Sequence, residues 1–337
     1  MRIGIAGIAS VSPPTETAWN LEDLVFRASS GALDDAGITR RDIDGVCISA
    51  SDQLDGRMIS SMHLAGPAGG YLRDEIKIAD DGLGALAGAV LRLEAGVSQS
   101  VLVAAWTKTS EADLGLAEAV NADPIYERPV GLHPAVGEAM AVQRSLHDHG
   151  LGVEHLDAIA NGTGPDDREY LAWPLRRCHV VPPTDGAVAL VLTAEPAGTR
   201  LLGFDWTTDH PNPLARPHDA LGAMRNLADR LEHRTGVDPT TADVIESTDR
   251  NTFRLLTAAA WTERRTPADV VSALADGTLE RLNPSGGLRV SNPPWAAGLE
   301  RVVEAVRAVR GGADRAVAHG SYGQAGQAHA LAVVEGS

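Results

Sequence analysis

Short runs of apolar residues alternate along this chain with longer segments in which apolar residues recur every three or four positions. Runs of the first kind are typical of buried strands, and segments of the second kind are typical of amphipathic helices. The sequence predicts strands at 3–9, 45–49, 75–78, 100–105, 187–193, 200–207, 244–246, 287–290, 315–319 and 328–334. It predicts helices at 20–36, 82–94, 136–149, 153–160, 220–235, 251–261, 267–275 and 294–310. Helices that alternate with strands favour an α/β fold in which helices cover the sheets.

One order of elements, a strand, a Gly/Ala-rich helix and a second strand, occurs twice. The first copy is DEIKIADDGLGALAGAVLRLEAGVSQSVLVAAW at 74–106, and the second is GGLRVSNPPWAAGLERVVEAVRAVRGGADRAVAHG at 286–320. The flanking segments repeat in the same order, 31–49 with 228–248 and 186–195 with 327–336. A period near half the chain length indicates internal duplication, because solenoid repeats are only about 20–50 residues long. We therefore expect two similar halves, 1–197 and 198–337, packed as one body.

Charge and composition exclude some classes of partner. The formal net charge is −16 over 337 residues, which disfavours nucleic acid and anionic membrane as partners. No apolar run approaches the roughly 18–20 residues of a membrane span, and Met1 leads directly into a predicted strand, so we expect a cytoplasmic protein. Of the two cysteines, Cys47 lies in a buried run, and Cys178 is followed by His179 on an extended segment where neighbouring side chains point apart.

The least regular part of the chain is 107–184, which carries Gly, Pro and His residues between the predicted helices. We expect it to be an excursion folded over one end of the molecule. Loops held on a rigid scaffold are where functional sites tend to lie.

Five segments together carry a resemblance to a known family. They are DDAGITRRDIDGV, DGLGALAGAVLRLEAG, PTDGAVALVLTAE, LNPSGG and AHGSYGQAGQAHALAVVEG. In this order they resemble the landmarks of the thiolase superfamily, especially its lipid-transfer-protein or sterol-carrier-type branch, over essentially the whole chain. The resemblance implies a duplicated thiolase fold of five layers, α-β-α-β-α, and a homodimer.

The residues at the family's catalytic positions differ. A thiolase of this kind begins its first-half Gly/Ala-rich helix at a nucleophilic cysteine, and the matching residue here is Ala79. The family's histidine falls on VSNPP, where Asn292 replaces it, and its second cysteine falls near Gly320. A methyl group cannot carry an acyl chain, so the resemblance does not extend to an acyl-enzyme.

A different reaction fits the substituted residues. Cleavage of a β-hydroxyacyl thioester by retro-aldol chemistry needs only an oxyanion site for the enolate and a base for the hydroxyl proton. Asn292, before a predicted helix, is the expected oxyanion donor, and Tyr322 is the first candidate for the base. Further candidates for the base are His319, Asp249 and His133.

The remaining expectations concern binding. The Gly-rich segments supply the predicted contacts of the thioester substrate, which are Gly286, Gly287, Gly320 and Gly323. Coenzyme A enters as part of this acyl-CoA substrate, so neither a separate cofactor nor a metal is predicted. The pattern is most similar to steroid side-chain-cleaving aldolases, which implies a small partner protein with a zinc ribbon and an OB-fold.

Several alternatives remain open. Of the pair Asp80 and Asp81, one carboxylate is expected to cap the helix, and the other to face the pocket as an acid or base. A Schiff-base aldolase would use Lys77. Loss of all three family residues also fits a non-catalytic, acyl-binding scaffold subunit of a heteromeric complex. An acyltransferase would need another nucleophile, Ser291 or Ser321.

Overall fold

The computed structural model describes residues 3–16, 18–56, 60–120, 122–160, 167–210, 212, 215–216 and 220–336. Its strands are β1 (Ile3–Val11), β2 (Gly45–Ser49), β3 (Asp74–Ile78), β4 (Ser100–Thr107), β5 (Tyr170–Ala172), β6 (Leu175–Arg176), β7 (Gly186–Thr193), β8 (Thr199–Thr208), β9 (Val244–Ser247), β10 (Arg315–Tyr322) and β11 (Ala328–Gly336). Nine of these strands overlap the strands that the sequence predicts. The short pair β5 and β6 was not predicted.

The helices are α1 (Leu21–Asp35), α2 (Ser60–Leu64), α3 (Gly82–Glu94), α4 (Leu114–Val120), α5 (Pro134–Asp148), α6 (Val153–Ala160), α7 (Leu221–Thr235), α8 (Thr252–Thr262), α9 (Pro267–Ala275) and α10 (Ala297–Arg310). The eight predicted helices are all present. The two that the sequence analysis missed, α2 and α4, are short. Among the described residues, no helix has both the length and the apolar composition to cross a membrane.

Two half-sheets meet edge to edge. The strand order is β3-β2-β4-β7-β1-β8-β11-β10-β9, so the strands of the first half lie together and are followed by those of the second half. The two halves are joined by β1 and β8, which pair at only two positions, Ile3 with Leu201 and Gly4 with Arg200. The predicted boundary between 197 and 198 falls in the connection between β7 and β8.

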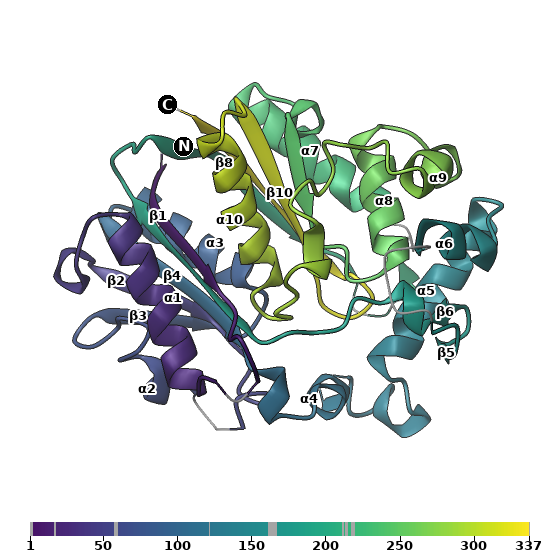
Figure 1. Ribbon diagram of the computed structural model, residues 1–337, viewed down its shortest axis with the longest axis horizontal. Coiled ribbons are helices and arrows are strands. Elements are labelled where there is room, and N and C mark those ends of the chain that lie inside the picture. Colours follow the sequence, from purple (N-terminus) through teal and green to yellow (C-terminus); the bar gives the residue numbers. More distant parts are fainter. Residues whose placement is uncertain are drawn as a thin grey trace.

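The five layers follow from which helices pack on which face of each half-sheet. The central layer is α3 and α10, which share one apolar core with β1, β4 and β7 of the first half and with β8, β10 and β11 of the second (Figure 1). The outer face of the first half-sheet packs against α1. The outer face of the second packs against α7 and α8. The arrangement is therefore α-β-α-β-α, as the resemblance to the thiolase superfamily implies.

The predicted strand at 287–290 is wrong. Gly287–Arg289 forms a turn of 3₁₀ helix, so the second half-sheet has four strands where the first has five. Gly286 and Gly287 have φ values of +93° and +63°, which lie in the left-handed region and break an extended chain. The carboxylate of Asp249 accepts a hydrogen bond from the Leu288 N–H, which in a strand would bond to a neighbouring strand.

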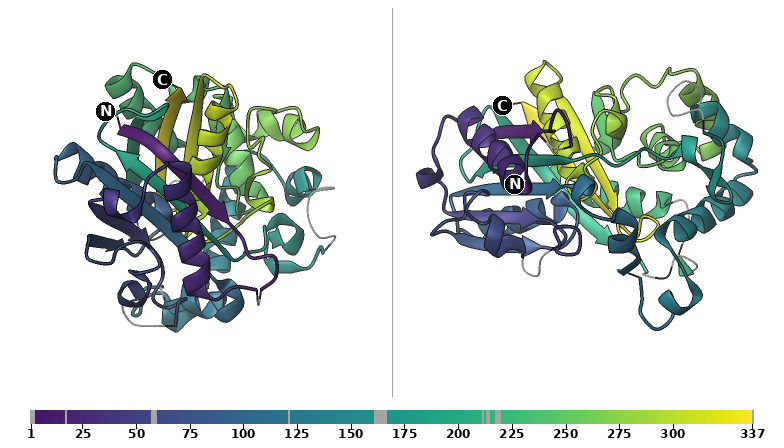
Figure 2. Two further views of the ribbon diagram at one scale, coloured as in Figure 1. Left: turned by 60° about the vertical axis from the view of Figure 1, so that its left-hand side comes forward. Right: turned by 60° about the horizontal axis from the view of Figure 1, so that its bottom comes forward.

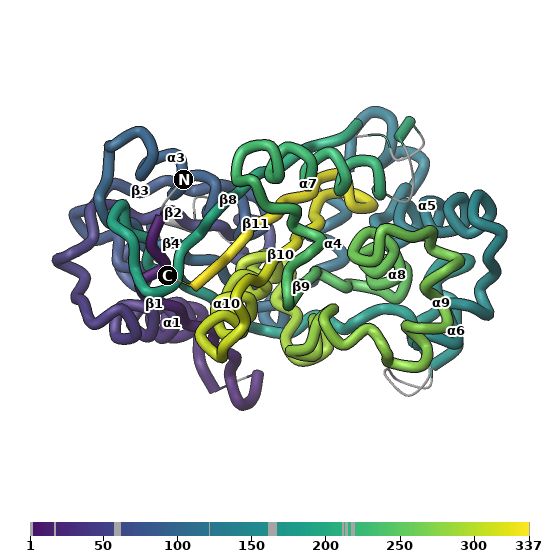
Figure 3. Tube along the Cα trace, turned by 90° about the horizontal axis from the view of Figure 1, so that it is seen from above, coloured from purple at the N-terminus to yellow at the C-terminus, as the bar shows by residue number. Residues whose placement is uncertain are grey.

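The excursion at 107–184 lies over one end of the molecule, as predicted. Its helices α5 and α6 lie with α8 and α9 at the end of the molecule opposite α1 and β2 (Figures 1 and 3), and Figure 2 shows the same grouping. A buried ion pair fastens α5 to α8, because Glu138 accepts hydrogen bonds of 2.7 Å from both Nε and Nη2 of Arg254. Asn251 donates to the same carboxylate at 2.8 Å. Positions 121 and 161–166 of the excursion lie outside the described residues.

The close approach of α3 and α10 depends on glycine. A Cβ placed on Gly298, the second residue of α10, would lie 2.8 Å from two side-chain carbons of Leu83 and would also overlap the Asp81 carboxylate. A Cβ on Gly320 of β10 would overlap Leu83 from the other side. The two central helices therefore begin side by side only because these positions carry no side chain.

We expect Gly298→Ala to destabilise the protein by about 1–3 kcal/mol, because the added methyl group has no space between the two helices. The matched control is Gly222→Ala, at the second residue of α7, where a Cβ meets nothing within 4 Å. This change should be neutral or stabilising by up to about 1 kcal/mol. Chemical denaturation of both variants measures the difference, and equal stability of the two would contradict the packing argument.

Candidate functional site

The buried carboxylate of Asp81 holds the starts of both central helices. It is the N-cap of α3 and accepts a hydrogen bond of 3.1 Å from the Leu83 N–H. Its second oxygen accepts a hydrogen bond, also of 3.1 Å, from the Gly298 N–H in the first turn of α10. Burial raises the pKa of Asp81 to about 6, against the effects of Arg250 and of the two amide donors. Asp81 is therefore the capping member of the acidic pair.

Asp80 is the member of the pair that remains available. Its side chain is half-buried, and one carboxylate oxygen accepts the Asp81 N–H at 2.8 Å. Its other oxygen has no hydrogen-bond partner among the described residues. Burial raises the pKa of Asp80 to about 6, and the neighbouring Asp81 charge adds to this rise, while the Asp81 N–H and Arg250 oppose it. A carboxyl group that titrates near neutral pH is suited to general acid–base catalysis.

Tyr322 reaches the same region from the last residue of β10. Its ring is 7% exposed and belongs to the core shared by α3 and α10. Burial raises the pKa of the Tyr322 hydroxyl, and the charges of Asp80 and Asp81 raise it further. Within the described part of the chain nothing hydrogen-bonds this hydroxyl. Tyr322 is therefore a neutral hydroxyl beside two carboxyl groups.

Arg250 is the cation of this site, and the sequence analysis did not identify it. It lies between β9 and α8, and its Nη2 is 3.9 Å from the Asp81 carboxylate. Its charge also acts on Asp80 and on two carboxyl groups of the excursion, Glu118 and Glu138. The only sequence signal was its place in STDR, directly after a buried strand.

His133 and Glu118 bring the excursion to the site. His133 is the N-cap of α5, where its Nδ1 accepts a hydrogen bond of 3.2 Å from the Ala135 N–H. Burial raises the pKa of Glu118 on α4, while Arg250 and then His133 oppose the rise. These electrostatic contacts place His133 on the excursion side of the site, with a capping role.

The architecture matches solved structures of thiolase-fold enzymes. One is described as "Ltp2-ChsH2(DUF35) aldolase", with a TM-score of 0.78, 20% identity, and coverage of 99% of this chain and 98% of that one. A human mitochondrial 3-ketoacyl-CoA thiolase has a TM-score of 0.75, 12% identity, and coverage of 100% and 99%. An acetyl-CoA acetyltransferase from Syntrophomonas wolfei has a TM-score of 0.73 and 14% identity, and the match covers 100% of this chain and 99% of that one.

The chain has the thiolase fold. No protein-family model matches its sequence, and no characterised protein is similar enough in sequence to match. The resemblance to the thiolase superfamily places that family's nucleophile just before α3. Ala79, which occupies this position, is exposed and is followed directly by Asp80 and Asp81.

Asn292 is also close to the start of α10 in this thiolase fold, but its amide is already engaged. The Asn292 Nδ2 donates hydrogen bonds to the carbonyl oxygens of Val181 at 3.0 Å and Pro182 at 3.2 Å. Its Oδ1 is buried without a partner among the described residues, and an acceptor cannot stabilise an oxyanion. In this geometry Asn292 anchors the end of the excursion to the second half.

His319 lies on the opposite face of β10 from Tyr322, because side chains alternate along a strand. Its Nδ1 is 2.8 Å from the Ser247 hydroxyl, and its Nε2 is 3.1 Å from the His329 Nδ1. Burial lowers the pKa of His319 to about 3, with a smaller effect from Arg254. His319 is therefore neutral and faces α8, away from the carboxylate pair.

Ser321 shares the outward face of β10 with His319. Its hydroxyl is 3.3 Å from that of Thr248, and its N–H donates to the same hydroxyl at 2.8 Å. The hydroxyl of Ser291 is buried without a partner among the described residues. Neither serine has the adjacent base that an activated nucleophile needs.

The predicted glycines and Asp249 form two separate groups. Asp249 is buried, its pKa is raised by burial, and its carboxylate packs against Gly287. Gly286 is the left-handed residue before that turn. Gly320 of β10 faces Leu83 of α3 and Gly298 of α10, and Gly323, with φ of +73°, follows Tyr322 directly. Contact of these glycines with a thioester stays a prediction.

Basic side chains that the alternatives require are engaged elsewhere. Lys77 of β3 pairs with Asp52, and Lys108 is buried with Asp185, 2.9 Å from its carboxylate. A Schiff-base nucleophile would first have to break such a pair. Arg216 likewise donates to the carbonyl oxygens of Gln324 and Ala325.

The one cluster with metal-ligand side chains in the described residues is Asp157, Cys178 and His179. The Nδ1 of His179 accepts the Arg176 N–H at 3.2 Å, so its Nε2 carries the proton that is shared with Asp157 at 2.8 Å. Both imidazole nitrogens are thus used by protein atoms, and this geometry fits a hydrogen-bonded histidine better than a metal ligand. Burial raises the pKa of the other thiol, Cys47, to about 11, which makes it inert.

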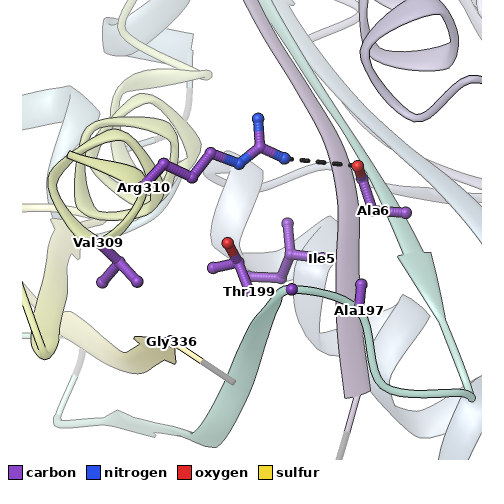
Figure 4. Close-up of a pocket in the computed structure, with 8 residues that line it drawn as sticks. Ile5, Ala6, Ala197, Thr199, Val309, Arg310 and Gly336 are labelled. Carbon is purple, nitrogen blue, oxygen red and sulfur yellow. Dashed lines mark hydrogen bonds between the residues drawn. The ribbon is translucent and has the colours of Figure 1, made fainter. Parts of the chain in front are cut away.

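A hollow of about 290 Å³ lies far from the carboxylate pair, where the two halves join (Figure 4). It is lined by Ile5, Ala6, Ala197, Gly198, Thr199, Val309, Arg310 and Gly336. Arg310 is at the last turn of α10, whereas Asp81 contacts Gly298 in its first turn, and the rise of the helix between these two residues is about 18 Å. The guanidinium of Arg310 already bonds Asp35 at 2.7 Å, so this hollow lacks acid–base groups.

The raised pKa of Asp80 predicts a pH-dependent cost to stability. A folded-state pKa of about 6, above the usual 3.8, means that the folded state binds the proton more tightly, so stability falls as pH rises from about 4 to about 6. We expect Asp80→Asn to raise the free energy of unfolding relative to the native chain. This gain should be about 1–2 kcal/mol larger at pH 7.5 than at pH 4.5. Urea unfolding at both pH values measures the gain, and a pH-independent difference would show that Asp80 is not perturbed.

Proposed function

We propose that this chain is a carbon–carbon lyase that cleaves a β-hydroxyacyl-CoA by a retro-aldol reaction, without an acyl-enzyme. The observation that carries the proposal is the start of α3. There, the exposed position expected to hold a nucleophile is Ala79, while a titrating carboxyl group, Asp80, and a neutral hydroxyl, Tyr322, lie beside it. Acid–base groups without a nucleophile suit a reaction that breaks a carbon–carbon bond by moving protons.

The proposed steps balance with these two residues. The Asp80 carboxylate takes the proton of the substrate β-hydroxyl, the bond between the α- and β-carbons breaks, and its electron pair forms the thioester enolate while the ketone leaves. The Tyr322 hydroxyl then gives its proton to the α-carbon. Asp80 returns the hydroxyl proton to the Tyr322 oxygen, which restores both groups. Tyr322 was the first candidate for the base. Burial raises the pKa of its hydroxyl, which therefore keeps its proton, and this favours Asp80 as the base.

Binding partners are part of the proposal. A coenzyme A thioester is the substrate class, in line with thiolase-fold neighbours that act on such esters. The neighbour described as an Ltp2–ChsH2(DUF35) aldolase is a two-protein assembly. We propose that this chain works as a homodimer together with a small protein that has a zinc ribbon and an OB-fold. Its acyl-CoA substrates would include those derived from steroid side chains.

Loss of the Tyr322 hydroxyl should lower cleavage. The chain, purified with its endogenous partners, is incubated with a β-hydroxyacyl-CoA that has a tertiary alcohol, and mass spectrometry follows ketone and shortened acyl-CoA. We expect Tyr322→Phe to reduce kcat by about 10²-fold or more, which is the usual size of a lost acid–base contribution. Tyr71→Phe, at an exposed tyrosine, is the control and should leave the rate unchanged.

Tight binding of the ester without turnover by the native complex would contradict the lyase proposal and support an acyl-binding scaffold. Detection of an acyl-enzyme would instead support an acyltransferase. A normal rate for Tyr322→Phe, with cleavage in the native chain, would remove Tyr322 from the mechanism.

The pH profile should report Asp80. Because the carboxylate form is the base, kcat/KM should rise with pH through about 6 and then level off. In Asp80→Asn this rise of kcat/KM through pH 6 should disappear, and kcat/KM should fall by at least about 10²-fold. The measurement is a series of initial rates from pH 5 to 8.5, and persistence of the limb in Asp80→Asn would assign it to another group.

A further inference from the structure

The amide groups at the start of α3 cannot stabilise an oxyanion, because each already has a partner. The Gly82 N–H donates to the Trp295 carbonyl at 2.8 Å, and the Gly84 N–H to the Asp81 carbonyl at 2.8 Å. The Leu83 N–H is used by the Asp81 side chain. A helix start usually offers free N–H groups to an anion, and here two backbone carbonyl groups and the Asp81 carboxylate occupy them.

Three amide groups around the start of α10 are used in the same way. The Gly298 N–H donates to Asp81, the Ala296 N–H to the Pro293 carbonyl, and the Trp295 N–H to the Thr107 hydroxyl. The side-chain amide of Asn292 donates both of its hydrogens to carbonyl oxygens of the excursion. The donor that the sequence suggested for an enolate oxygen beside Asp80, the side-chain amide of Asn292, is therefore already used.

Arg250 still has donors to offer. Its Nη2 donates one hydrogen bond, of 2.9 Å, to the Pro294 carbonyl, which leaves a second Nη2 hydrogen, and no hydrogen bond to Nη1 is present in the described part of the chain. Its Nε is buried without a partner among these residues. The side chain is 33% exposed, so a bound molecule can reach it. Its backbone is fixed on both sides, because its carbonyl accepts the Val181 N–H at 2.9 Å and the next residue, Asn251, bridges to Val180.

The charges around Arg250 match this role. Four carboxyl groups face it from three directions, Asp80 and Asp81 at the start of α3, Glu118 on α4 and Glu138 on α5. An enolate that develops among carboxylates is strongly disfavoured unless a cation lies beside it. Arg250 is the group in the described site that can supply this positive charge.

We propose that Arg250 is a catalytic residue that binds the thioester oxygen and stabilises the enolate, in the place that the sequence analysis gave to Asn292. The inference rests on the proposed function, since it names the group that holds the enolate formed by retro-aldol cleavage. It also requires that the chain form the same enolate from the shortened product, by the reverse proton transfer at the α-carbon.

Exchange of α-protons tests Arg250 separately from cleavage. The native complex is incubated in D₂O with acetyl-CoA, the product of a substrate without an α-methyl group, and with propionyl-CoA, the product of a substrate that has one. Mass spectrometry follows the uptake of deuterium. We expect exchange by the native chain and a loss of about 10²–10³-fold in Arg250→Gln, with little change in the Kd of the ester. Arg250→Lys should recover part of the rate, because it keeps the charge but not the planar donor pair.

The matched control is Arg281→Gln. Arg281 also has a side chain that is 33% exposed and also donates to backbone carbonyls, but it lies at the far side of α8, against Glu263. Its loss should leave exchange unchanged. If Arg250→Gln fails to fold by circular dichroism, Arg250→Lys is compared with Arg281→Lys in the same assay.

The outcomes separate the two proposals. Exchange without cleavage in the native complex would overturn the lyase function, while a loss of that exchange in Arg250→Gln would support the role of Arg250. Cleavage and exchange at native rates in a folded Arg250→Gln would overturn the role of Arg250 and leave the lyase intact. Absence of exchange in the native complex would overturn the inference.

Discussion

One buried carboxylate, that of Asp81, connects the two halves of this molecule at the place where both central helices begin. It accepts the Leu83 N–H of α3 and the Gly298 N–H of α10, one with each oxygen. Helix starts carry unsatisfied donors and partial positive charge, so a shared anion stabilises both at once. Gly298 and Gly320 leave the space in which this contact forms. Asp80 directly precedes Asp81 in the chain, and Arg250 lies 3.9 Å from the Asp81 carboxylate.

The same contact explains why the site differs chemically from a nucleophile site. In many proteins the start of such a helix lowers the pKa of a thiol or binds an anionic ligand. Here the donors are consumed by the chain itself, and burial, not hydrogen bonding, dominates the pKa of Asp80 and Asp81. The result is a pair of carboxyl groups with pKa values of about 6, and the charge of Arg250 opposes any further rise of these pKa values.

Position in a strand decided which candidates come together. His319 and Tyr322 are three residues apart, so on β10 they point to opposite faces, one toward α8 and the other toward α3 and α10. The sequence placed both on the last Gly-rich segment without showing that a strand extends through it. Asn292 was correctly placed near α10, but its hydrogen bonds to Val181 and Pro182 depend on the excursion, 110 positions away.

The sequence by itself determined most of the helices and strands, the duplication and the excursion, because these follow from apolar periodicity and the order of repeated segments. It failed at 287–290, where two glycines with positive φ replaced the expected strand. Only the tertiary structure decided that Asp81 caps the helix while Asp80 stays free, and that Arg250 faces both. Burial and the direction of a side chain depend on contacts between distant segments, and no local pattern records these contacts.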